Sequence, residues 1–375
     1  MDVGLGVSCR LRWALVLVFL LVLPVRARAD VGTPLVWGTA FQLLFGNALL
    51  GCAEGWLVAR IAGLSFRRCV GWMILASYLS SWAGFWGFTA LFETWHPDVY
   101  TVRWAGWCLL VAAYVATVVL EWPFVALCCR RLEHWFQTSV KSSLLVQTGS
   151  YLVLFGGFYL LSLSWLFAGW SLVRPAELEL PRNVVAFYIS TDGRHVYAAR
   201  LDGQPGVRIA DLDGFDPWQD HLGLVPSEGH TNDWDLAVVR RQDPVQRVWP
   251  RVSSLEKVSP QMAQRTSYYW RWGLKPFEAG PEGGSPWEVH WSMWPEMGLW
   301  ARRGDQMVAV RVMTPFGGYS VWQAVQLPGD LVLVQFEDQV CAVDLSRRRM
   351  ALLCRGMGIL ALHDDQVVNM PPGLR

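Results

Sequence analysis

The stretch WAGWCLLVAAYVATVVLEWPFVAL, residues 104 to 127, decides the predicted fold class because it holds a single charged residue, Glu121. At 1.5 Å per residue, a helix over this stretch is about 36 Å long, and the hydrocarbon core of a bilayer is about 30 Å thick. Three other apolar stretches of similar length lie at about 34 to 59, 69 to 92 and 145 to 172. The sequence therefore predicts a membrane all-α bundle of four transmembrane helices over residues 30 to 175.

The composition of the chain supports a membrane protein. Of its 375 residues, 53% are hydrophobic and only 17% are charged, whereas soluble domains have about 45 to 50% and about 25%. The 32 Lys and Arg residues balance 31 Asp and Glu residues, so no net charge draws the chain to nucleic acid. Lysine is scarce, which we associate with GC-rich bacterial genomes, and we therefore expect a bacterial cell membrane as the location.

The N-terminus has the pattern of a signal peptide over residues 1 to 29. Arg10 and Arg12 precede an apolar run from Trp13 to Leu23, and Ala27-Arg28-Ala29 has the form of a cleavage site. The alternative is an uncleaved anchor. Eleven apolar residues cover only about 16 Å of the bilayer, which favours cleavage.

The charges between the apolar stretches predict the orientation. Basic residues gather in the first and third connections, and only Arg103 lies in the second. Those of the first and third connections are Arg60, Arg67, Arg68, Arg130, Arg131 and Lys141. Since basic loops stay in the cytoplasm, we expect residues 176 to 375 on the extracytoplasmic side.

Two carboxyl groups fall inside the predicted spans. Glu54 lies six residues before Arg60, and Glu121 lies nine before Arg130, which places them about 9 and 13 Å from the cytoplasmic arginines. Asn47 precedes Glu54 by two helical turns and projects from the same face. The hydroxyl groups expected at the same level belong to Ser77, Tyr78, Ser150 and Tyr151.

The polar candidates inside the spans are thus Asn47, Glu54 and Glu121. Two alternatives remain for the glutamates: they form a proton or ion site, beside a kink at Pro123, or they hydrogen-bond to neighbouring helices and hold the bundle together. The absence of an intramembrane Lys or Arg fits a protonatable pair better than a salt bridge. In the same span, Gly51 and Gly55 form a G-x-x-x-G pattern that permits close helix packing.

Residues 176 to 375 have the pattern of an all-β domain. Charges, Gly and Pro return near Pro175, and the Asp192-Gly193, Asp202-Gly203 and Asp213-Gly214 dipeptides indicate tight turns between short strands. Six further strands are expected at 307–313, 319–326, 331–336, 339–345, 350–354 and 358–363. The stretch LVLVQFEDQVCAVDL, residues 331 to 345, resembles blade strands of a β-propeller, and a sandwich is the other fold that suits the spacing.

A disulfide is possible between the two cysteines of this domain. If residues 346 to 349 form the hairpin loop, Leu345 faces Met350 and Cys341 faces Cys354, within disulfide reach. The alternative is two buried free thiols, since a slip of one residue in register separates them.

We find no catalytic motif, no spacing typical of a metal site and no cofactor motif in the sequence. The first functional hypothesis is therefore an integral membrane protein whose extracytoplasmic β domain binds or scaffolds another envelope protein or polymer. Aromatic residues would suit such a surface but equally a core: Tyr268, Tyr269, Trp270, Trp272, Trp287, Trp291, Trp294 and Trp300. The second hypothesis is translocation of a proton, an ion or a solute by Glu54 and Glu121, with lipid as the surrounding partner.

Overall fold

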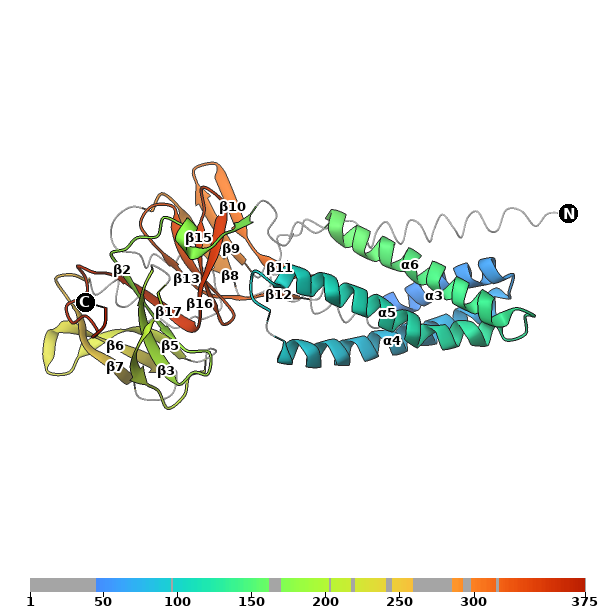
Figure 1. Cartoon of the computed structure of the whole chain (residues 1–375), viewed down its shortest axis with the longest axis horizontal. Helices are drawn as coiled ribbons and strands as arrows, with labels where there is room; N and C mark the ends of the chain where they lie inside the picture. The colour runs from blue at the N-terminus through green and yellow to red at the C-terminus, as the bar shows by residue number, and fades with distance from the viewer. Residues whose placement is uncertain are drawn as a thin grey trace. The chain divides into compact units, whose positions relative to one another are not determined.

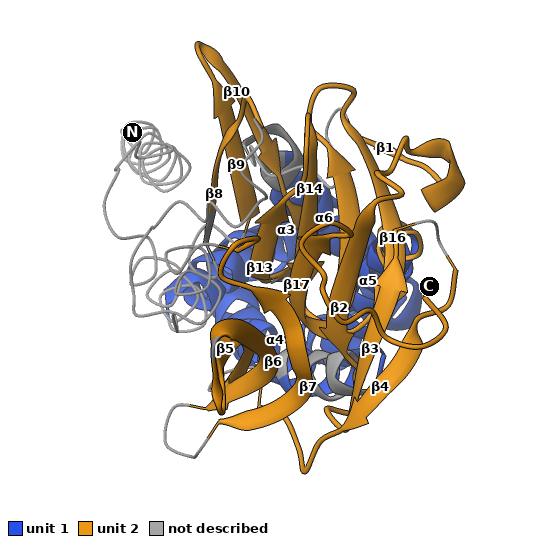
Figure 2. Cartoon of the chain, turned by 90° about the vertical axis from the view of Figure 1, so that its left-hand side faces the viewer, with its two compact units in different colours: residues 1–96, 104–163 blue, residues 97–103, 164–375 orange. Residues whose placement is uncertain are grey.

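The chain forms two compact units, shown in different colours in Figure 2. This computed structural model describes residues 45–95, 97–161, 170–201, 204–216, 220–240, 245–258, 285–292, 298–314 and 317–374. One unit, Met1–His96 with Trp104–Leu163, is helical where it is described, and we call it the helical unit. The other, Pro97–Arg103 with Ser164–Arg375, is built mainly from strands, and we call it the β unit.

The described part of the helical unit consists of helices that follow one another along the chain (Figure 1). They are α3 (Asn47–Ala62), α4 (Phe66–Thr94), α5 (Val102–Cys129) and α6 (Trp135–Leu161). Helix α3 ends at Gly63, whose φ of 65° lies in the left-handed region that glycine adopts freely. The short turn after it leads directly into α4, so these two helices pack along each other.

The predicted bundle of four spans is wrong for the described residues. Among the helices that the structure describes, only α5 is both long and apolar enough to cross a membrane. Helices α4 and α6 have 29 and 27 residues, but serine, threonine, tyrosine and glutamine side chains make them too polar by the same measure. Helix α3 has 16 residues as described, fewer than the roughly 20 that a spanning helix needs. The predicted signal peptide lies outside the described residues, so the structure gives it no support.

Polar side chains are buried in the helical unit and large apolar ones are exposed. Glu54 and Glu121 expose only 1% and 2% of their surface, whereas Trp104, Leu152 and Val153 expose 74%, 70% and 72%. Soluble helices normally place their apolar stripe inward and their charged residues outward. The described helices thus bury two carboxyl groups beside the apolar cluster of Val58 and Met73 while they expose other large apolar side chains.

The β unit confirms the prediction of a β-rich domain. Its strands are β1 (Ser171–Leu172), β2 (Val184–Ile189), β3 (His195–Arg200), β4 (Val207–Asp211), β5 (Asp220–Ser227), β6 (His230–Arg240), β7 (Gln246–Ser254), β8 (Glu288–Ser292), β9 (Gly298–Arg303), β10 (Gln306–Val310), β11 (Val312–Thr314), β12 (Gly317–Tyr319), β13 (Val321–Gln326), β14 (Leu331–Phe336), β15 (Gln339–Asp344), β16 (Arg349–Arg355) and β17 (Met357–His363). A 3-10 turn, Pro175–Glu177, precedes β2. The Asp192-Gly193 turn joins β2 to β3 as expected, with Gly193 at a φ of 70°.

The strands pair antiparallel except for β1 with β16, and most neighbours in the sheets are consecutive in the chain. Their strand orders are β17-β2-β3-β4, β5-β6-β7, β10-β9-β8, β11-β12 and β1-β16-β15-β14-β13. Two pairings join distant parts of the chain, since β17 lies beside β2 and β1 lies parallel to β16. The last strand of the unit is thus hydrogen-bonded to one of its first.

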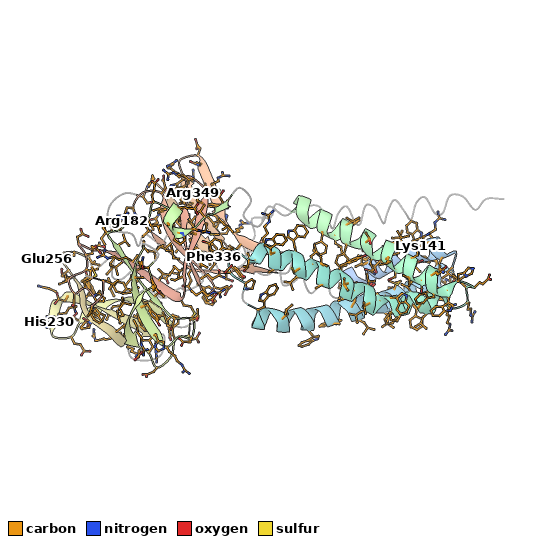
Figure 3. The ribbon with its side chains drawn as sticks, in the orientation of Figure 1. Lys141, Arg182, His230, Glu256, Phe336 and Arg349 are labelled. Carbon is orange, nitrogen blue, oxygen red and sulfur yellow. The ribbon has the colours of Figure 1, made fainter. Side chains whose placement is uncertain are left out.

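Separate apolar clusters fill the interior of the β unit. Phe336, labelled in Figure 3, is fully buried in one of them, and Phe187 is fully buried in another. The Phe336 cluster also contains Val99, from the connection between α4 and α5, and Val102, the first residue of α5. A short segment from the helical half of the sequence is therefore part of the β-unit core.

The structure does not support the predicted disulfide. Strands β15 and β16 pair with Val343 opposite Met350, whereas the prediction had Leu345 opposite Met350, so the register differs by two residues. Cys341 therefore lies opposite Leu352 and belongs to the Phe336 cluster, whereas Cys354 packs against a different cluster on the other face of the sheet. Both thiols are free.

Candidate functional site

Two buried glutamates form the most unusual polar feature of the helical unit. Glu54 lies on α3 and Glu121 on α5, and both are almost completely buried. Each is surrounded by hydroxyl or amide groups from helices α4 and α6. All four described helices therefore contribute a side chain to one cluster. We call Glu54 and Glu121, at its centre, the carboxyl pair.

Serines from two helices hold the Glu54 carboxyl. Ser150 of α6 donates a hydrogen bond to Glu54 Oε1 at 2.7 Å. Ser77 Oγ of α4 lies 3.2 Å from Glu54 Oε2. Both donors are neutral, and a hydroxyl can also accept a hydrogen bond. The surroundings of Glu54 can thus serve either its ionised or its protonated form.

Glu121 is held in a similar way from α4 and α6. Ser80 Oγ donates to Glu121 Oε1 at 2.5 Å, and Gln147 Nε2 donates to Glu121 Oε2 at 2.5 Å. The Gln147 amide also bonds to Glu54, and the two carboxyl groups are close enough to interact electrostatically. Gln147 therefore links the two glutamates into one site.

The charge of the carboxyl pair has no counterion among the described residues. Every bond described above comes from a neutral hydroxyl or amide. An ionised pair would place two like charges side by side away from water, which is costly unless a proton or a cation neutralises one of them. The Gln147 amide donates its N–H toward the pair, where a metal cation would need an oxygen ligand. The donor set thus fits a proton better than a metal ion.

Two glycines allow α3 to approach α4 closely beside this site. A Cβ atom on Gly51 would lie 2.5 Å from Ile74 Cα, and one on Gly55 would lie 2.6 Å from Val70 Cα. These distances are shorter than real Cβ contacts. The G-x-x-x-G pattern seen in the sequence is therefore a helix-packing motif here.

The other polar residues expected at this level have separate partners. Asn47 is buried and its Oδ1 accepts a hydrogen bond from Ser81 Oγ at 2.9 Å. The hydroxyl of Tyr151 bonds to Thr117 Oγ1 at 2.9 Å. Pro123 lies inside α5, which continues past it to Cys129.

Sequence reasoning named Ser77 and Ser150 but missed Ser80 and Gln147. A signal for both was present in the spacing, because Ser80 follows Ser77 by three residues and Gln147 precedes Ser150 by three. Side chains three residues apart share one face of a helix. Which face meets the glutamates is decided by how the helices pack.

The aromatic residues considered as a binding surface do not form one in the described part of the β unit. Trp287 is buried in the core, and its Nε1 donates to Asp330 Oδ1 at 2.7 Å. Trp300 is partly buried with the Arg311 guanidinium 4.8 Å from its ring. The side chains of Trp291 and Trp294, and residues 268 to 272, lie outside the described part. Binding of an envelope partner by the β unit stays a prediction.

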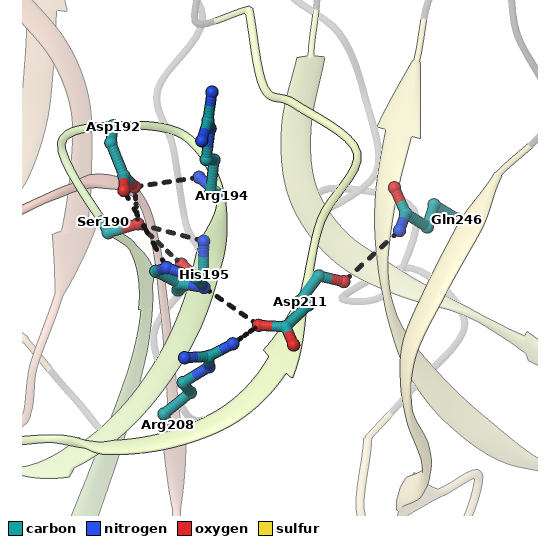
Figure 4. A network of polar contacts seen from close by, with 7 residues as sticks. All are labelled: Ser190, Asp192, Arg194, His195, Arg208, Asp211 and Gln246. Carbon is teal, nitrogen blue, oxygen red and sulfur yellow. Dashed lines mark hydrogen bonds and ion pairs between the residues drawn. The ribbon is translucent and has the colours of Figure 1, made fainter.

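A polar network at the β2–β3 turn, drawn in Figure 4, has the residue types of a hydrolase site but not its geometry. The network consists of Ser190, Asp192, Arg194, His195, Arg208, Asp211 and Gln246. His195 Nδ1 lies 2.9 Å from Asp211 Oδ1, but the Ser190 hydroxyl donates to Asp192 and accepts the backbone N–H of His195. The hydrogen bond from Ser190 lowers the pKa of the Asp192 carboxyl. This serine therefore secures the Asp-Gly turn rather than acting as a nucleophile.

No group of three His, Cys, Asp or Glu residues could hold a metal ion in the described part of the chain. Asp211, the first residue of the acidic loop 211–216, bonds to His195 and Arg208. In comparisons with known proteins, no family model matches the chain and no curated protein matches it. The carboxyl pair therefore has to be interpreted from its own geometry.

Proposed function

We propose that this chain is a membrane protein that binds and releases a proton at Glu54 and Glu121. The observation that carries the proposal is the burial of two carboxyl groups that share the Gln147 amide and receive only neutral hydrogen bonds. Ionisable groups inside a membrane are rare, and they commonly mark proton or ion pathways. Reversible protonation is the chemistry that this donor set supports best.

The surface polarity of the helices supports a lipid surrounding. Trp104, Leu152 and Val153 are largely exposed, and α5 meets the length and hydropathy of a membrane span. Lipid contact would remove this apolar surface from water, at about 25 cal/mol per Å². The bacterial cell membrane and an extracytoplasmic β unit remain predictions from the sequence.

Infrared spectroscopy of the purified protein in nanodiscs tests the proton site directly. A buried protonated carboxyl gives a C=O band separate from that of carboxylate, and we expect this band to appear as pH falls and to vanish in Glu54→Gln/Glu121→Gln. Glu133→Gln is the matched control, because Glu133 is exposed in the same unit. A double variant that keeps the wild-type band would overturn the proposal.

Proteoliposomes then distinguish a proton carrier from a static proton site. With a pH-sensitive dye inside the vesicles, wild type and Glu133→Gln are expected to dissipate an imposed pH gradient faster than Glu121→Gln. Equal rates for all three would limit the carboxyl pair to proton binding without transport.

A further inference from the structure

A seven-residue segment that follows α4 and ends in the first residues of α5 belongs to the β unit. This segment, Pro97–Arg103, includes the first two residues of α5 and is grouped with the β unit by its contacts, and we call it the strap. Val99 and Val102 of the strap expose 0% and 2% of their surface and pack in the Phe336 cluster. The β-unit core is therefore incomplete without residues that precede β1 by about 70 positions.

The side chain of a buried glutamine makes two hydrogen bonds to the backbone of the strap. Gln339 of β15 accepts the backbone N–H of Val99 at 2.8 Å and donates to the carbonyl of Pro97 at 3.2 Å. The hydroxyl of Tyr319 donates to the same Pro97 carbonyl at 2.5 Å. Gln339 is 1% exposed, so loss of its bonds would leave buried backbone groups without partners.

A tyrosine fastens the strap to a second strand of the same sheet. The hydroxyl of Tyr100 donates to the carbonyl of Val173 at 2.8 Å and accepts the backbone N–H of Leu352, in β16, at 3.1 Å. These bonds join three segments that are far apart in the sequence. The strap is thus an internal part of the β unit and not a loop resting on it.

Helix α5 starts inside the strap. Asp98 Oδ1 accepts the backbone N–H groups of Tyr100 and Thr101, and Thr101 Oγ1 accepts the backbone N–H of Asp98 at 3.0 Å. This reciprocal pattern is that of a capping box, which satisfies the free backbone N–H groups at the start of a helix. The same helix runs on without a break to Cys129 and carries Glu121.

We propose that the strap couples the β unit to the carboxyl pair. A change in packing around Gln339 displaces the capped start of α5, and α5 transmits the displacement to Glu121. The titratable groups that face Glu121 are Glu54 from α3 and Tyr151 from α6, with Ser80 of α4 beside them. Because coupling is reciprocal, proton binding at Glu121 must also alter the strap. This inference rests on the proposed function.

The test uses the full chain in nanodiscs with two strap variants. Gln339→Met removes both bonds at similar volume, and Tyr319→Phe removes one bond as a milder change. Gln306→Met, at an exposed glutamine of β10, is the control. We expect about tenfold faster hydrogen exchange at the amides of Val99 to Val102 in the strap variants only. We also expect their carboxyl titration midpoint to shift by about one pH unit, a tenfold change in proton affinity.

Each outcome separates the coupling from the proton site. Faster exchange with an unmoved midpoint would overturn the coupling while leaving the proton site in place. Absence of the carboxyl band in wild type would overturn the proposed function, and the coupling with it. In the reciprocal experiment, Glu121→Gln is expected to change exchange in the strap, and identical exchange rates would contradict the proposal.

Discussion

Substitution of Gly51 by alanine probes the close packing that brings α3 to α4 beside the carboxyl pair. The new Cβ would lie 2.5 Å from Ile74 Cα, 2.7 Å from Ile74 N and 2.9 Å from the carbonyl oxygen of Met73. All three are backbone atoms of α4, so no side-chain rotation relieves the clash. Carbon atoms normally approach to about 3.5 to 4.0 Å, so the helices must separate by about 1 Å.

The magnitude follows from two opposing effects. Overpacking of a tight interface costs about 1 to 3 kcal/mol, whereas Gly→Ala inside a helix gains about 1 kcal/mol of propensity. Gly71→Ala in α4 isolates the second effect, because a Cβ there meets no atom within 4 Å. The propensity gain cancels between the two variants, so Gly51→Ala is expected to be less stable than Gly71→Ala by about 1 to 3 kcal/mol.

The free energy of unfolding can be measured by titrating detergent-solubilised protein with a denaturing detergent and following helix content by circular dichroism. Gly51→Ala/Gly55→Ala extends the comparison, since Gly55 makes the same kind of contact with Val70. Equal unfolding free energies for Gly51→Ala and Gly71→Ala would refute the close approach of α3 and α4.

Two further predictions concern the β unit. Burial alone would raise the pKa of Asp235, but hydrogen bonds from the backbone of Arg251 and from Ser227 and Arg247 lower it below the ordinary 3.8. Ionised Asp235 therefore stabilises the fold above pH 3.8, and this stabilisation is lost as the pH falls through the lowered pKa. Asp235→Asn should cost about 1 to 3 kcal/mol at neutral pH and weaken the acid dependence of stability, and an unchanged acid-unfolding curve would contradict this. Burial raises the pKa of Cys354 to about 12, so Cys341 and Cys354 should resist alkylation in the native protein. Both should be alkylated after denaturation without reductant, because both are free thiols. A disulfide-linked peptide in a non-reducing digest would show the register of β15 on β16 to be wrong.

Local sequence patterns were sufficient to predict the positions of several strands of the β unit. Strands β14, β15 and β17 lie at or within one residue of their predicted bounds, because alternating or continuous apolar runs between turn residues are properties of a few neighbouring positions. The register of β15 on β16 was not predictable in this way. That register depends on where the hairpin closes, which is with Asp344 opposite Arg349, and it places Cys341 opposite Leu352 instead of Cys354.

In the helical unit, too, some features were predictable from local sequence patterns and others were not. Counting residues from the basic connections indicated that Glu54 and Glu121 lie at a similar depth, and the structure places both in one buried cluster. Apolar length alone overestimated the spans, since polar side chains inside α4 and α6 leave α5 as the one candidate in the described part of the chain. Hydropathy reports the average of a stretch and not which side chains face inward.

The sequence by itself determined the N-terminal helical and C-terminal β-rich character of the chain, the Asp-Gly turn at Gly193 and the positions of the buried carboxylates. Only the tertiary structure decided that Ser80 and Gln147 complete the carboxyl pair and that the strap belongs to the β unit. Helix and turn preferences act over a few residues, whereas the bond between Val99 and Gln339 joins positions 240 residues apart. Such a contact depends on the packing of the whole unit, and no local pattern encodes it.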